Sequence, residues 1–149
     1  MKVTYKNITV EIICILYGTL FFYAAISKAL DYQKFQVQLG QSPLRSAYAD
    51  WIAFLVPTIE FILVILLFIV PLRLFALFAS FFLMVMFTAY IIIILNFSDF
   101  VPCSCGGILE ELGWTEHLIF NVAFIILAGV AIWIVNNKKY KNNIKYNTA

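Results

Sequence analysis

Two cysteines separated by one residue are the most reactive pair of side chains in this sequence. Cys103 and Cys105 stand in the motif PCSCGG, residues 102–107. A disulfide between them closes a small, strained ring, and strain makes a disulfide easier to reduce. The two glycines that follow allow the backbone to turn tightly and a partner to approach. The pair therefore favours thiol–disulfide exchange, with a structural disulfide and a soft-metal site as the alternatives.

The rest of the chain has the composition of a membrane protein. It has 149 residues, of which 64% are hydrophobic and 12% are charged, which argues against a soluble or nucleic-acid-binding protein. Four apolar segments are long enough to cross a bilayer, which takes about 20 helical residues: 8–26, 51–70, 72–95 and 117–135. Because backbone amides in hydrocarbon must be satisfied internally, we predict an all-α, four-helix transmembrane bundle. This single domain covers residues 1–135, and residues 136–149 form a basic, frayed tail.

Two shorter features connect the predicted spans. Residues 31–39 place Tyr32, Phe35 and Leu39 near one helical face, which predicts a short interfacial helix that lies on the membrane and ends at Gly40. Pro71 separates the second span from the third and suits the first turn of a helix. The connection is so short that these two spans must be antiparallel neighbours.

The placement of Lys and Arg predicts the orientation of the bundle. An even number of spans puts both termini on one side, together with seven basic residues: Lys2, Lys6, Arg73, Lys138, Lys139, Lys141 and Lys145. The other side carries Lys28, Lys34 and Arg45. Basic residues favour the cytoplasmic side, so we expect cytoplasmic termini in a bacterial inner membrane. The cysteine loop then faces the periplasm, where disulfides form and persist.

A few polar side chains in the outer part of the spans could line a pocket beneath this loop. Glu60 lies near the midplane, where a charge is costly unless it is protonated, paired or in a cavity. Asn121 follows His117 by one helical turn, and Thr88 lies in the third span. The functional interpretation is a proton or quinone site; the alternative, favoured for Thr88 and Asn121, is hydrogen bonding between helices. His117 could also stabilise a thiolate or complete a soft-metal site with the cysteines, or simply lie at the interface.

Lys28 and Cys14 have simpler expected roles. Lys28 ends the first span, so we expect its side chain to extend to the outer headgroups, with Asp31 or an acid of the cysteine loop as alternative partners. Cys14 lies deep in the first span and is expected to be an inert core residue. Without a second exchangeable pair, thiols alone cannot carry electrons across the membrane.

Taken together, these residues resemble the MauE/DoxX family of four-helix membrane proteins. The resemblance rests on Gly18, residues 27–31 (SKALD), Phe35, residues 57–60 (PTIE), Arg73 and residues 102–107 (PCSCGG). It implies a redox-associated inner-membrane protein. MauE-like members are linked to methylamine utilisation and to disulfide formation beside a thioredoxin-like partner, and DoxX-like relatives to quinone-coupled sulfur oxidation. The resemblance assigns the redox pair to Cys103 and Cys105 and an intramembrane acid to Glu60.

The leading hypothesis is a membrane thiol–disulfide redox protein. Cys103 and Cys105 would exchange disulfides with an exported thioredoxin-like or substrate protein, and electrons would pass to a quinone held near Glu60, His117 and Asn121, with no resident metal. One alternative is a non-catalytic assembly subunit whose disulfide shapes a docking loop. A third hypothesis is handling of a soft metal such as Cu(I) by Cys103, Cys105 and His117.

Overall fold

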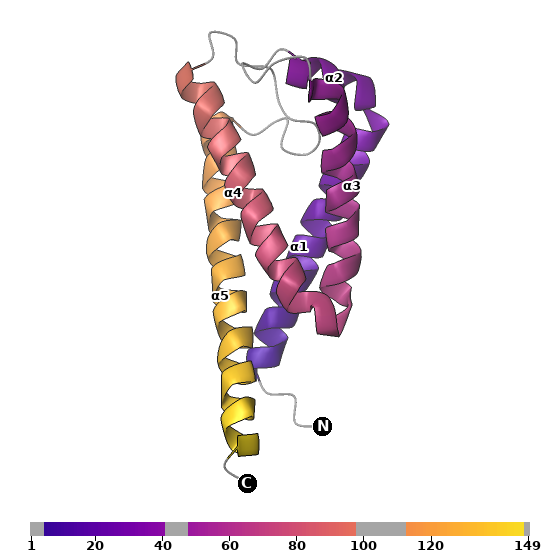
Figure 1. Cartoon of the computed structure of the whole chain (residues 1–149). Coiled ribbons are helices and arrows are strands. Elements are labelled where there is room, and N and C mark those ends of the chain that lie inside the picture. The colour runs from indigo at the N-terminus through magenta and orange to yellow at the C-terminus, as the bar shows by residue number, and fades with distance from the viewer. Residues whose placement is uncertain (1–4, 41–47, 98–112, 148–149) are drawn as a thin grey trace.

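The structure, a computed structural model, describes residues 5–40, 48–97 and 113–147. In these ranges the polypeptide is almost entirely helical. Five α-helices follow in order (Figure 1): α1 (Tyr5–Leu30), α2 (Tyr32–Gly40), α3 (Ala49–Phe68), α4 (Arg73–Phe97) and α5 (Trp114–Asn147). A 3₁₀ turn, η2 (Val70–Leu72), joins α3 to α4. Both termini and η2 lie at one end of the bundle, which we call the terminal end; α2 lies at the opposite, loop end.

Four of these helices, α1, α3, α4 and α5, are long and apolar enough to cross a membrane. Their candidate spans, Ile8–Leu30, Asp50–Phe68, Val70–Ile93 and Thr115–Asn137, confirm the four predicted segments. The helices differ from the prediction mainly at their ends. α1 continues through Lys28 because the charge of Lys28 is neutralised inside the bundle, as described below. α5 continues to Asn147 instead of fraying after Val135, since each residue added to an existing helix gains a hydrogen bond without a new nucleation cost.

The α1–α2 junction is a single-residue break at Asp31. Helical hydrogen bonds continue across it, from Asp31 N to Ser27 O and from Phe35 N to Asp31 O. A short helix, α2, is present where one was predicted, with Phe35 buried on its inner face; its place at the membrane interface stays a prediction. Gln36 Nε2 donates to Asp50 Oδ1 at 2.6 Å, which fastens α2 to the first turn of α3. α2 is therefore held against both helices that flank it.

The α3–α4 connection is as short as expected, and Pro71 lies within η2. Arg73 Nε donates to Leu67 O at 3.2 Å and so satisfies a carbonyl in the last turn of α3. Carbonyls at the end of a helix lack partners within it, and a basic side chain there is favourable. Arg73 thus closes the turn as well as adding positive charge at the terminal end.

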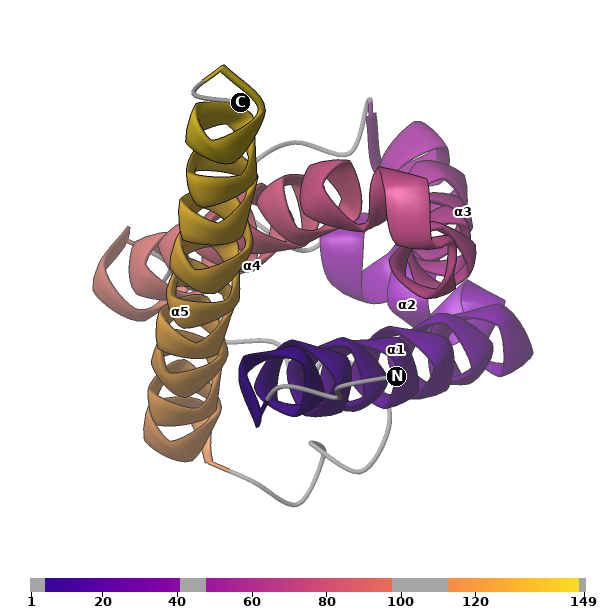
Figure 2. The same cartoon turned by 90° about the horizontal axis from the view of Figure 1, so that it is seen from below.

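The helices pack mainly as two pairs, α1 with α3 and α4 with α5, which smaller contacts join through α1–α5 and α3–α4. Viewed from below, the four long helices surround a common axis and do not form a flat layer (Figure 2). Small residues allow the close approach: a Cβ added to Gly18 of α1 would meet the Phe68 ring of α3 at 3.1 Å. Such small-residue contacts are the usual basis of helix association in membranes, where lipid competes with apolar side chains.

The main hydrophobic core fills the terminal half of the bundle. Its members include Val10, Ile13, Cys14, Tyr17, Leu63, Leu67, Ala76, Leu77, Ala128 and Ala131. From mid-depth to the loop end, in contrast, the buried side chains include Lys28, Glu60 and Asn121. The polar residues singled out from the sequence therefore gather in one half of the molecule.

Candidate functional site

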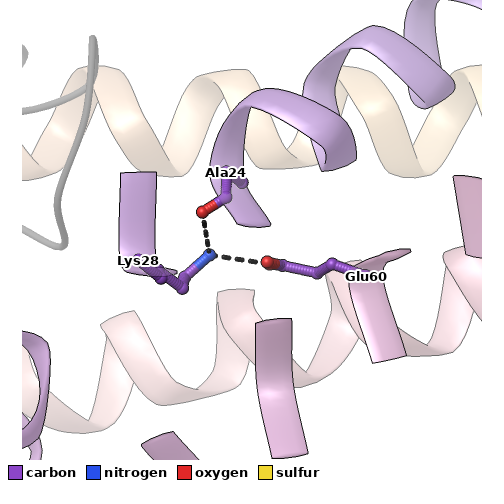
Figure 3. A network of polar contacts seen from close by, with 3 residues as sticks. All are labelled: Ala24, Lys28 and Glu60. Atoms are coloured by element: carbon purple, nitrogen blue, oxygen red, sulfur yellow. Dashed lines mark hydrogen bonds and ion pairs between the residues drawn. The ribbon is translucent and has the colours of Figure 1, made fainter. Parts of the chain in front are cut away.

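The centre of this polar half is an ion pair between α1 and α3. Lys28 Nζ lies 2.7 Å from Glu60 Oε1, and both side chains are buried, with 9% and 0% of their surface exposed. The ammonium also lies 3.5 Å from Ala24 O, one turn back along α1, so the lysine side chain points into the bundle (Figure 3). The expectation that Lys28 extends outward to the headgroups was wrong, and its partner is Glu60 rather than Asp31. The acids of the cysteine loop, the other alternative, lie outside the described residues. Glu60 is fully buried and needs a partner for its charge, and the attraction between the two charges is strong where water is excluded, which offsets part of the cost of burying Lys28.

Two aromatic rings complete the surroundings of the ammonium. Lys28 Nζ lies 5.9 Å from the ring centroid of Phe35 on α2 and 5.6 Å from that of Phe87 on α4. Cation–π attraction is effective within about 6 Å and is strongest where water is excluded. Four helices, α1 to α4, therefore contribute a group to one buried charge. Moving any one of them would change the environment of Lys28.

Glu60 is buried near the middle of the bundle. It lies about 16 Å along α3 from Ala49 at 1.5 Å per residue, in a hydrocarbon layer about 30 Å thick. Its Oε1 atom binds Lys28, whereas its Oε2 atom has no hydrogen-bond partner among the residues that the structure describes. Glu60 is thus paired, as its predicted position requires, and it retains one free acceptor.

α5 brings His117 and Asn121 to the same half. His117 is half-buried and close enough to Lys28 for the two side chains to interact electrostatically. Asn121 follows one turn deeper and is 3% exposed; its Nδ2 atom has no hydrogen-bond partner within the described ranges. A buried amide donor without a partner is uncommon, since most buried polar atoms are hydrogen-bonded. The interhelical hydrogen bond expected for Asn121 Nδ2 is therefore not found there.

Thr88 is less available to bind a ligand or another helix. Its Oγ1 donates to Met84 O at 2.8 Å within α4, so its only donor is used by its own helix. Of the pocket residues proposed from the sequence, the structure brings together Lys28, Glu60 and His117.

Cys103 and Cys105 lie outside the described residues. They belong to the segment that joins Phe97, at the end of α4, to Gly113, just before α5. Cys14 is buried and unpaired in α1, which agrees with its expected place in the core. No group of three His, Cys, Asp or Glu side chains in the described parts could hold a metal ion.

Sequence reasoning missed two polar residues of the interior. Tyr17 is fully buried, and its hydroxyl donates to Phe124 O at 2.6 Å, which links α1 to α5. Ser80 on α4 is also fully buried, and its Oγ has no partner among the described residues. The available signal was a hydroxyl inside an apolar run, because such a group must find a partner or remain costly.

This arrangement agrees with the comparison with protein families. The family model described as methylamine utilisation protein MauE matches residues 6–134, which covers most of the chain. The chain belongs to the MauE family. No curated protein and no solved structure matches it. The MauE match begins in α1 and ends in the apolar part of α5, so it includes Lys28, Glu60, His117 and Asn121. This chain is therefore a multi-pass membrane protein of the MauE family with a buried Lys–Glu pair.

Proposed function

We propose that this protein is a membrane thiol–disulfide redox protein in which Cys103 and Cys105 exchange a disulfide with an exported thioredoxin-like or substrate protein. The proposal places the chain in a bacterial inner membrane, with both termini in the cytoplasm and residues 98–112 on the periplasmic side. The distribution of Lys and Arg supports this orientation. An oxidising compartment would supply the conditions in which the pair cycles.

The observation that carries the proposal is the buried ion pair of Lys28 and Glu60, which lies in the half of the bundle where α4 ends and α5 begins. Bundle stability alone does not require an ion pair at this depth, because well-packed apolar residues of similar size are often as stable. Ionisable residues inside a membrane commonly mark proton or ligand sites. A redox-active thiol pair needs such a site, since thiols lose protons together with electrons.

The exchange step is balanced between two pairs of cysteines. Written in the direction of substrate oxidation, a partner thiolate attacks one sulfur of the Cys103–Cys105 disulfide and forms a mixed disulfide. The partner's second thiolate then resolves it. The partner leaves with a disulfide, and Cys103 and Cys105 remain as a dithiol that has gained two electrons and two protons.

Two unpaired polar atoms of the interior support a quinone as the acceptor of these electrons. Glu60 Oε2 is a free acceptor and Asn121 Nδ2 a free donor, which fits the hydroxyl and carbonyl groups of a quinone head. We assign Glu60, Lys28, His117 and Asn121 to this pocket, with Thr88 at its edge. A bound quinone would take up two electrons and two protons as the Cys103–Cys105 disulfide is restored. Glu60 would hold or release a proton, and Lys28 would keep its carboxylate charge balanced.

Redox trapping in cells tests the proposal. Cells that express the full chain in a Cys14→Ser background are quenched with acid and labelled with a maleimide–polymer tag, during growth and with the respiratory quinone pool held reduced. We expect Cys103 and Cys105 to be oxidised during growth and to become reduced when the quinone is blocked. A pair that stays oxidised in both conditions would contradict exchange and support the assembly-subunit alternative.

Four variants sharpen this test. Cys103→Ser and Cys105→Ser should each abolish function and trap mixed disulfides with the partner through the remaining thiol, whereas Cys14→Ser should behave like the natural chain. If a Cys103→Ser/Cys105→Ser double variant keeps full function, the redox role is wrong. If both thiols stay reduced during growth and copper copurifies with the chain, soft-metal handling replaces it.

A further inference from the structure

Ser80 behaves differently from four other hydroxyl and amide side chains of the long helices. The Thr19, Thr58 and Thr88 hydroxyls and the Asn96 amide each donate to the carbonyl four residues earlier in their own helix, at 2.7–2.9 Å. This bond is the usual solution for a polar side chain in an apolar helix. Ser80 is fully buried, and its Oγ makes no such bond within the described part of the chain. Its hydroxyl is therefore directed to something other than the helix backbone.

Ser80 lies on the face of α4 that looks toward the ion pair. Residues seven apart share a helix face, and Phe87, seven residues after Ser80, places its ring 5.6 Å from Lys28 Nζ. Met84, between them on that face, is 2% exposed. Counted from the ends of η2, Glu60 lies about 15 Å and Ser80 about 12 Å into the bundle at 1.5 Å per residue. Ser80 and Glu60 are thus at similar depth on neighbouring helices.

Three buried polar atoms on three helices lack a partner among the described residues: Glu60 Oε2 on α3, Ser80 Oγ on α4 and Asn121 Nδ2 on α5. Leaving one such group unsatisfied costs about 1–3 kcal/mol, and more for a charged one. Together they offer an acceptor, a donor, and a hydroxyl that can serve as either. Buried water in proteins typically bonds to such groups and makes about three hydrogen bonds.

We propose that the bundle binds internal water against Glu60, Ser80 and Asn121, and that Ser80 is a positioning residue for the free oxygen of Glu60. The water gives the Glu60 carboxyl a hydrogen-bonded route for proton exchange that the apolar core cannot provide. The site stops at Ser80, because the terminal half beyond it is filled by the hydrophobic core. This inference goes beyond the proposed function and requires no chemistry at Cys103 or Cys105. Because the proposed quinone uses the same atoms of Glu60 and Asn121, the water is their partner when no quinone is bound.

Radiolytic footprinting of the full-length protein in lipid nanodiscs tests the water site. Hydroxyl radicals formed from bound water oxidise neighbouring side chains even when these are buried. We expect Met84, which lies one helical turn from Ser80, to be oxidised strongly. Cys14 and Tyr17, equally buried members of the same hydrophobic core on α1, should be protected despite their intrinsic reactivity. Met84 labelling no greater than that of Cys14 and Tyr17 would overturn the proposal.

Matched variants of α4 give the second readout. Ser80→Ala should lose most of the Met84 labelling and shift the infrared carboxyl band that Glu60→Gln removes. Thr88→Ala, whose hydroxyl already bonds to Met84 O, should leave both signals unchanged. If the infrared band of Glu60 were unchanged in Ser80→Ala, Ser80 would have a packing role only and would not position Glu60. Because the measurements can be made in a Cys103→Ser/Cys105→Ser background, failure of the redox proposal would not affect them.

Discussion

The two halves of the bundle are buried in different ways. The terminal half is closed by apolar and small side chains, whose contacts are numerous and individually weak. The half toward the loop end also buries apolar side chains such as Phe21, Ala25 and Ile91, but it adds one ion pair, to which α1, α2, α3 and α4 each contribute a contact. An apolar core loses stability gradually when trimmed, whereas an ion pair in a medium without water fails when either partner is removed. The difference supports the proposal that the half toward the loop end, and not the terminal half, contains the functional site.

The largest effect should come from breaking the ion pair. Lys28→Met leaves Glu60 as an uncompensated buried carboxylate. We expect the protein either to lose about 3–5 kcal/mol of stability or to keep Glu60 protonated and neutral. Adding Glu60→Leu should recover most of the stability but not the function. Thermal unfolding of the purified variants in detergent measures the effect. Asp31→Asn serves as the control, because Asp31 is exposed and does not pair with Lys28. If Lys28→Met and Lys28→Met/Glu60→Leu were equally stable, the comparison between the two halves would be contradicted.

A core truncation in the terminal half should rank next. Leu77→Ala removes a fully buried side chain, and a loss of about 2–5 kcal/mol is expected from the cavity. Leu95→Ala, on the same helix but 41% exposed, should cost much less. The redox response of Cys103 and Cys105, measured by trapping, should stay intact in every Leu77→Ala molecule that folds. A folded Leu77→Ala protein with no redox response would show that the halves are not separable.

Tyr17→Phe removes one hydrogen bond between α1 and α5. The expected loss is about 0.5–1.5 kcal/mol, because the ring and its contacts with Phe124 remain. Denaturant titration of the reconstituted protein gives the value. Tyr23→Phe, a change in the same helix outside the hydrophobic core, is the comparison. A loss as large as that of Leu77→Ala would mean that the hydroxyl, and not packing, joins the two helix pairs.

The smallest effect is expected for Gln36→Ala, which cuts the exposed hydrogen bond to Asp50. Stability should fall by less than about 1 kcal/mol, since exposed polar contacts compete with water. The useful readout is local: hydrogen exchange at α2 amides should rise while that of α4 stays the same. Equal hydrogen exchange at the α2 amides in Gln36→Ala and in the unchanged protein would mean that Phe35 alone keeps α2 in place.

Much of the fold was predictable because apolar length is a strong signal in a membrane. The four spans and α2 follow from the positions of the apolar residues, and Glu60 was recognised as an expensive group at the midplane. Its partner, Lys28, was not predicted. Lys28 stands near a helix end, where a long basic side chain usually reaches water, and the sequence does not say that its helix leans toward α3. Ser80 and Phe87 were missed for a similar reason, since their significance depends on which face of α4 turns inward.

The order of synthesis gives the Lys28–Glu60 pair a further consequence. The two residues are separated by 32 positions, so at about 5–20 residues per second Lys28 waits several seconds for its partner. During that time α1 can enter the membrane with the lysine held at the surface, since Lys28 is only two residues from the end of the helix. Glu60 lies in the middle of α3, so its side chain cannot reach the membrane surface in the same way. The arrival of α3 would therefore draw Lys28 inward, and this single movement would mark the moment at which the first helix pair of the bundle is assembled.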